Sequence, residues 1–276
     1  MQSILAVLMG LFCVSGVTAQ DKCKLDVRSQ VGDKVTQTEK FFLEGSFTIT
    51  MGEIKQEMEM FETKNEVSID HVLSVDEDGW RSKVRRTVKT KGKREKNPGE
   101  PEEKETVSPL QGKTFVVIQD GEDSRYEEIP EGLKESDLSE MDLRRPIFVK
   151  FLPKGDVSVG QSWEIPEKEL LEDWAKDQGE DGMKMSSGSA EGTLKGIEEK
   201  IAIVVYVVKM KGKTDNEMDS TIAMTVTARI DHTTGRMLSL NGKGKMTLSG
   251  EMEQGGQAME VSGNFSMKMA ETYSYE

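Results

Sequence analysis

The sequence has few of the residues that most often build catalytic or metal sites. It contains two histidines, His71 and His232, and two cysteines, Cys13 and Cys23. The histidines are far apart and lack a metal-ligand spacing such as H-E-x-x-H, and the chain has no G-x-S-x-G elbow, P-loop or G-x-G-x-x-G motif. These absences argue against a histidine-based hydrolase or a zinc enzyme. We therefore expect a non-enzymatic protein without a cofactor or metal.

The chain also has fewer positively charged than negatively charged residues. Lys and Arg number 37 against 50 Asp and Glu, so the formal net charge is −13. Nucleic acids and anionic membranes require a basic surface, which argues against either as the main partner. One basic run covers residues 81–94. Because it is embedded in an acidic chain, we expect it to pair with the protein's own Glu-rich segments.

Long apolar runs are confined to the N-terminus. Residues 1–19 carry no charged side chain and end in Val17-Thr18-Ala19, a small-x-small cleavage pattern. This is typical of a secretory signal peptide, and it is shorter than a membrane span. No other segment could cross a bilayer, so we expect an exported protein, periplasmic or extracellular. Removal of residues 1–19 would leave Cys23 as a free thiol or an intermolecular link.

The rest of the chain predicts two β-rich halves. The first covers residues 20–152 and includes a Pro/Glu/Lys-rich loop near residues 95–109. The second covers residues 153–276, a helix followed by an antiparallel meander. Leu170, Leu171 and Trp174 are spaced for a helix over residues 167–176. Residues 178–192 are rich in Gly and Ser and predict a loop.

Hydrophobic patterning in the second half favours strands. Residues 197–213 form an apolar, β-branched run that predicts a central strand buried on both faces or nearly so. Residues 220–231, 236–250 and 257–275 alternate apolar and polar side chains, as in an antiparallel sheet with one covered face. The fold class is therefore mainly β with minor α: a curved, half-barrel-like antiparallel sheet with one or two helices packed on it.

Similar landmarks occur in the same order in both halves. Val31-Gly32-Asp33 matches Val159-Gly160-Gln161, and Lys89 to Lys93 matches Lys209 to Lys213 in a Lys-x-Lys-Gly-Lys pattern. An internal repeat and a chance similarity of strand-and-turn sequences both explain this match.

Methionine is abundant, with 17 residues. A Met-lined sheet face can adapt to a variable apolar ligand, because the side chain is unbranched and polarizable. The candidate ligand-binding residues share the apolar face of the meander or come from the predicted helix: Met224, Met246, Phe265, Met267, Met269 and Trp174. The alternative is that these side chains simply fill the core under the helix.

Two parts of the second half resemble a known group of proteins: the segment Val157 to Trp163 and the turn Asp231 to Arg236. These residues resemble uncharacterised exported bacterial β-rich proteins, in which a V-G-x-x-W phrase precedes a D-x-x-T-G-R turn. More loosely, the architecture is similar to lipoprotein-carrier half-barrels, whose curved sheet and helices hold acyl chains. Neither resemblance implies catalytic residues.

The sequence thus predicts an exported binding or envelope-associated module that carries a lipid or other apolar ligand on its Met-rich face. One alternative is a structural or protein-interaction module with a self-filled core. A hydrolase using some of the abundant carboxylates is a third reading, which a pocket of converging carboxylates would favour.

Overall fold

The computed structural model describes residues 21–276 except 101, 122, 140, 179–182, 215 and 255–256. The predicted signal peptide and Cys13 lie outside the described residues. Within the described ranges, no helix is both long and apolar enough to cross a membrane.

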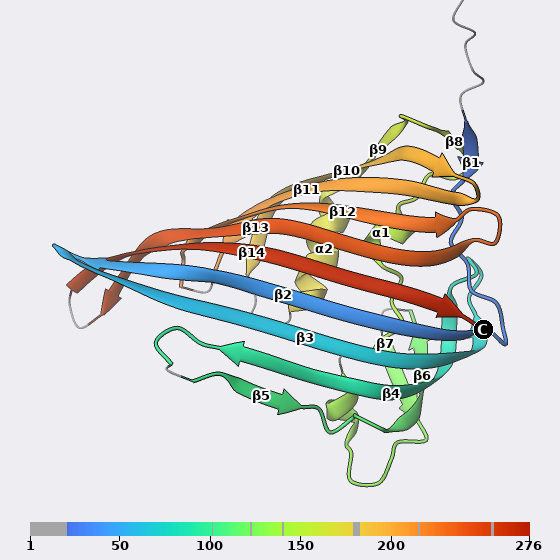
Figure 1. Ribbon diagram of the computed structural model, residues 1–276, viewed down its shortest axis with the longest axis horizontal. Helices are drawn as coiled ribbons and strands as arrows, with labels where there is room; N and C mark the ends of the chain where they lie inside the picture. Colours follow the sequence, from blue (N-terminus) through green and yellow to red (C-terminus); the bar gives the residue numbers. More distant parts are fainter. Residues whose placement is uncertain are drawn as a thin grey trace, which may run out of the picture.

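Twelve strands form one curved, open antiparallel sheet (Figure 1). Their order is β7-β6-β4-β3-β2-β14-β13-β12-β11-β10-β9, and β5 also pairs with β4. The strands are β2 (Lys34–Met51), β3 (Ile54–Val75), β4 (Arg81–Lys96), β5 (Lys104–Val107), β6 (Thr114–Asp120), β7 (Asp123–Glu127), β9 (Ser162–Ile165), β10 (Lys184–Glu198), β11 (Ile201–Lys213), β12 (Asp219–Asp231), β13 (Arg236–Gln254) and β14 (Gln257–Tyr275). The prediction of a mainly β, half-barrel-like fold is confirmed.

The remaining elements are short. β1 (Lys22–Lys24) pairs with β8 (Asp156–Ser158) in a separate ladder. The helices are α1 (Ile147–Lys150), α2 (Glu167–Gln178) and the 3-10 helix η1 (Glu135–Leu138). In Figure 1, α1 and α2 both lie behind the sheet. We call the face that they cover the inner face; it carries Tyr206, whose hydroxyl donates a hydrogen bond to the Phe148 carbonyl of α1 at 2.6 Å.

Burial on β11 differs from the prediction. Ala202, Val204, Tyr206 and Val208 are buried on the inner face, but Val207 on the other face is 47% exposed. The β-branched residues of the outer face therefore reflect strand propensity more than burial.

The predicted loop over residues 178–192 is partly wrong, because β10 already begins at Lys184. Glycine occurs in this strand at positions where neighbouring side chains pack too closely to leave room for a Cβ. A Cβ at Gly188 would lie 3.1 Å from Leu170 of α2, and one at Gly192 would lie 2.6 Å from the rings of Trp163 and Tyr206. The α2 prediction is confirmed, and Leu170 is buried as expected.

The Pro/Glu/Lys-rich segment near residues 95–109 also holds more structure than predicted. β4 continues to Lys96, and after a turn β5 pairs with it. All four residues of β5 are exposed. An edge strand needs a backbone hydrogen-bond partner but no apolar side chains. The sequence of β5 is polar, so hydrophobic patterning does not predict this strand.

The two halves join in one sheet, because β14 pairs with β2 along nearly its whole length. Each half begins with the same turn. Gly32 donates its N–H to Val72 O at 2.9 Å and Val72 donates to Asp33 O at 2.9 Å; Gly160 and Leu194 make the corresponding bonds at 2.7 and 3.1 Å, the second to Gln161 O. A register shift follows both Val72 and Leu194.

Two hydrophobic clusters lie on the inner face. The larger packs β10 to β14 against α1, α2 and the N-terminal segment, and includes Tyr206 and Leu194. The smaller packs β2, β3, β4 and β6 against the chain that follows β7, and includes Phe115 and Leu138. Cys23 belongs to the larger cluster as a buried free thiol, and burial raises its pKa.

Candidate ligand-binding groove

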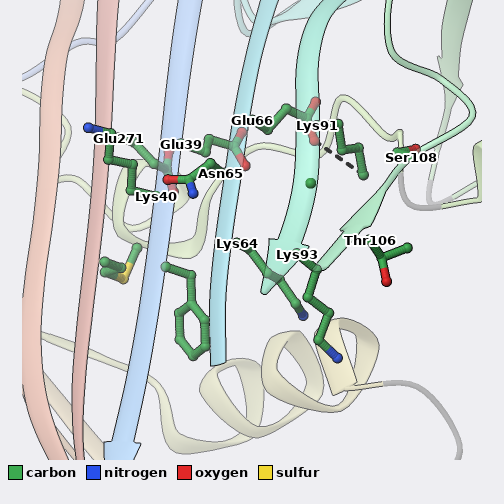
Figure 2. A pocket seen from close by; sticks show the side chains of 13 residues that line it. Glu39, Lys40, Lys64, Asn65, Glu66, Lys91, Lys93, Thr106, Ser108 and Glu271 are labelled. Carbon is green, nitrogen blue, oxygen red and sulfur yellow. Dashed lines mark ion pairs between the residues drawn. The ribbon is translucent and has the colours of Figure 1, made fainter. Parts of the chain in front are cut away.

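A groove of about 640 Å³ opens on the inner face beside α2 (Figure 2). It is formed by β2, β3, β4, β5 and β14. Its lining residues are Glu39, Lys40, Phe41, Lys64, Asn65, Glu66, Lys91, Gly92, Lys93, Thr106, Ser108, Met269 and Glu271. The volume is within the usual range of small-molecule pockets.

Strand register explains how these residues meet. Glu271, Glu39, Glu66 and Lys91 stand directly opposite one another on β14, β2, β3 and β4. We call this row the acidic rung. In Figure 2 its three glutamates cross the upper part of the view.

Two residues further along the strands comes a second row, Met269, Phe41, Lys64, Lys93 and Thr106. We call it the mixed rung. Since side chains alternate between faces with a period of two, both rungs point to the same face of the sheet.

The acidic rung holds three carboxylates side by side, an arrangement that repulsion disfavours. Lys91 pairs with Glu66 at 3.2 Å, the Tyr273 hydroxyl donates to Glu271 at 2.5 Å, and the Gln37 amide donates to Glu39 at 2.5 Å. Burial raises the pKa of Glu39 to about 7, with further upward contributions from Glu271 and Glu66. Glu39 therefore titrates near neutral pH.

The mixed rung combines apolar and cationic groups. The Lys64 ammonium lies 5.9 Å from the centre of the Phe41 ring and 3.1 Å from Glu62. Lys93 contacts Glu95 and lies 3.7 Å from Glu62. Each lysine is thus already balanced by a carboxylate of the same sheet.

Beyond the acidic rung lies a buried ion network. Asp70 is fully buried and accepts hydrogen bonds from Arg81 at 2.7 Å and from Arg86 at 2.8 Å. Burial acts to raise the pKa of Asp70, but the two guanidinium groups lower it overall. A smaller polar cavity of about 300 Å³ next to this network shares Glu39, Glu66 and Glu271 with the groove.

The predicted ligand-binding residues gather around one cluster but not around the groove. Met246 and Phe265 are buried in the larger hydrophobic cluster, and Met224, Met267, Met269 and Trp174 are half-buried against it. Only Met269 lines the groove. The space under α2 is largely filled by the protein's own side chains.

Glycines on the inner face allow this filling. A Cβ at Gly242 would lie 2.5 Å from Met269 Cγ and 3.4 Å from Met224 Sδ. The methionine side chains therefore lie directly over glycine backbone. Such a close approach is one reason for glycine in the interior of a strand.

The basic run over residues 81–94 pairs with carboxylates of the chain, as predicted. Lys83 pairs with Glu127 and Arg85 with Glu128, both at 2.8 Å, and Arg94 contacts Glu103. On the inner face the partners are Glu66 and Asp70. These contacts supply a structural role for the run.

Neither histidine belongs to the groove. His71 is exposed on β3, and His232 is half-buried in the turn after β12. In that turn Asp231 accepts hydrogen bonds from Thr233 and Thr234, so the D-x-x-T-G-R phrase builds a turn. Among the described residues, no three His, Cys, Asp or Glu side chains are placed to hold a metal ion.

No protein-family model matches the chain, and a search of curated proteins finds no significant match. The resemblance to exported β-rich proteins and to lipoprotein-carrier half-barrels therefore stays a prediction.

Proposed function

We propose that this protein is an exported binding module that holds the apolar chain of an amphiphile in the inner-face groove. The observation that carries the proposal is the position of Phe41 and Met269, which form an apolar wall in an open groove of about 640 Å³. Leu43 and Met267 extend this wall by one more pair along the strands, and both pack against the larger hydrophobic cluster.

The expected affinity follows from the apolar surface that a ligand can bury. Each methylene removed from water contributes about 0.8 kcal/mol, so about ten methylenes supply at most about 8 kcal/mol. That corresponds to a dissociation constant on the order of 1 μM before ordering costs are subtracted. Micromolar binding of a ten-carbon chain is thus the strongest that the wall could give.

Export is proposed from residues 1–19, which have the pattern of a secretory signal peptide. A duplication of the two halves is likewise a proposal. Its support is the pair of matched turns at Gly32 and Gly160, each followed by a register shift in the strand that it contacts.

Binding of decanol is the direct test. The Phe41→Ala variant removes part of the wall, and we expect its affinity for decanol to fall about tenfold in titration calorimetry. Phe42→Ala is the matched control, because Phe42 is the next residue of β2 and faces the other side of the sheet. Equal affinities in both variants and the unaltered protein would contradict a chain site at Phe41.

A second candidate function is hydrolysis, which the acidic rung favours. Glu39, with its pKa of about 7, could act as a general acid while Glu271 or Glu66 acts as a base. A panel of glycosides and esters tests it. Turnover that disappears in Glu39→Gln would support the hydrolase, and absence of turnover across the panel would leave the binding module.

A further inference from the structure

The outer face of the C-terminal half carries a block of basic and neutral side chains. In Figure 1, α1 and α2 lie behind these strands, so the outer face points away from both helices. Strand register defines the block as the odd-numbered residues of 205–211, 221–227 and 241–247 and the even-numbered residues of 264–270. None of these is acidic, and five are lysines: Lys209, Lys211, Lys243, Lys245 and Lys268. We call this surface the lysine block.

The lysines of the block have no carboxylate partners. All five are exposed, and none makes an ion pair with a described residue. Lys243 and Lys268 stand directly opposite each other on β13 and β14. Like charges in that position destabilise a sheet, so an anion bound between them would offset their repulsion. The ammonium of Lys268 lies 5.6 Å from the centre of the Phe42 ring.

Residues next to the block do not neutralise it. The adjoining positions on β10 and β2, and one row beyond each end of the block, hold as many carboxylates as cations: Glu44, Glu191 and Asp219 against Lys40, Lys213 and Arg229. Lys213 pairs with Glu217 at 2.8 Å, and Arg229 pairs with Glu198 at 3.2 Å. Eight cations against five carboxylates leave an excess of three positive charges on and around the block.

Neutral hydrogen-bonding side chains lie between the lysines. Thr221 and Thr225 of β12 separate the lysines of β11 from those of β13, and Asn264 and Ser266 continue the surface on β14. Hydroxyl and amide groups both donate and accept hydrogen bonds. The block has no aromatic side chain on which a nucleic-acid base could stack, and no large apolar side chain that could enter a bilayer. It therefore suits a ligand that combines hydroxyl groups with negative charge.

We propose that the lysine block is a docking surface for an acidic polysaccharide, whose carboxylates bind the lysines while its hydroxyls bond to the threonines and Asn264. The net charge of −13 allows this. At 0.1 M salt, exposed charges more than about 10 Å apart are largely screened, so a bound carboxylate responds mainly to the nearby lysines. The site lies on the opposite face from the groove and does not depend on the chain site.

Polygalacturonate and neutral dextran test the surface, with binding to the full chain measured by titration calorimetry. We expect polygalacturonate to bind and dextran not to bind. The affinity for polygalacturonate should fall at least about tenfold when NaCl is raised from 50 to 300 mM, because the contacts are exposed ion pairs. Equal binding of both polymers, or no binding of polygalacturonate at 50 mM NaCl, would overturn the proposal.

Two double variants locate the site. Lys243→Gln with Lys245→Gln should weaken binding about tenfold, whereas Lys243→Arg with Lys245→Arg keeps the charges and should bind like the unaltered protein. Lys154→Gln with Lys168→Gln is the matched control for net charge, because both residues are exposed and lie outside the block. Equal weakening in the control would show that net charge alone governs binding and would overturn the site.

Vesicles of phosphatidylglycerol and single-stranded oligodeoxythymidine test the other anionic partners. Tighter binding of either than of polygalacturonate, lost in Lys243→Gln with Lys245→Gln, would overturn the polysaccharide and assign the surface to that partner. Decanol binding should be unchanged in every lysine variant. The chain site in the groove and the lysine block on the outer face can therefore fail separately.

Discussion

Two regions of the same sheet begin alike and end differently. The turns at Gly32 and Gly160 make corresponding hydrogen bonds, yet β2 runs for 18 residues after the first, while β9 runs for 4 residues after the second. The chain after β9 passes Pro166 into α2, which packs on β10. The four-residue β9 is thus followed by a helix that packs on the C-terminal half, whereas the 18-residue β2 continues along the open groove.

The polarity of the inner-face residues differs in the same way between the two regions. Under α2 the face is apolar, and Met246 and Phe265 are 7% and 3% exposed. Along β2 and β3 it carries charged rungs beside Phe41. A sheet face without a covering helix can keep water and charged groups, so charge there is compatible with the same alternation that builds a core.

The largest expected effect comes from the buried ion network of the N-terminal half. Asp70→Ala leaves two buried guanidinium groups without their partner, and we expect a loss of about 3–5 kcal/mol in the free energy of unfolding, measured with urea. Glu127→Ala, which breaks the exposed pair with Lys83, should cost less than about 1 kcal/mol. Similar losses of unfolding free energy in Asp70→Ala and Glu127→Ala would contradict a special contribution of Asp70 to the stability of the N-terminal half.

The pH dependence of stability should single out Glu39. Its pKa is about 7 in the folded protein against an ordinary value of 4.5, so between these values the folded state holds a proton that the unfolded state releases. The free energy of unfolding should therefore decrease as pH rises from 4.5 to 7, by at most about 3 kcal/mol.

Glu39→Gln removes that titration. Its free energy of unfolding, followed by urea denaturation between pH 5 and pH 8, should fall less than that of the unaltered protein. Glu44→Gln should retain the full decrease. Parallel profiles for all three proteins would contradict a buried, titrating Glu39 in the acidic rung.

A smaller effect should mark the close packing of the covered half. At Gly192 an added methyl group meets the Trp163 and Tyr206 rings, so we expect Gly192→Ala to cost about 1–3 kcal/mol of unfolding free energy. Gly196, on the same strand, has nothing within 4 Å of a built Cβ, and Gly196→Ala should be nearly neutral. Equal costs would show that packing above β10 is loose.

Local patterns predicted the sheet but not the groove. Alternation along β12 and β14 and the spacing of Leu170 and Trp174 depend on neighbouring residues, so the meander and α2 were predictable from sequence. The Gly- and Ser-rich sequence over residues 184–192 predicts a loop but forms part of β10, since Gly and Ser suit both a loop and a strand against which a helix packs.

The acidic rung depends on register between distant segments. Glu39 and Glu271 are 232 positions apart in the numbering, and only the pairing of β2 with β14 brings them together. In sequence, such carboxylates look like solvated charges. The one local signal was the imperfect alternation of residues 34–47, where Glu39 shares a face with Phe41 and Leu43.

Native mass spectrometry of the protein, purified from the cells that naturally make it, tests the central claim most directly. The account predicts a mass above that of the polypeptide by one apolar ligand, which organic extraction releases and Phe41→Ala diminishes. A bare polypeptide mass that stays unchanged after incubation with cationic, neutral and anionic amphiphiles would contradict it and favour a self-filled interaction module.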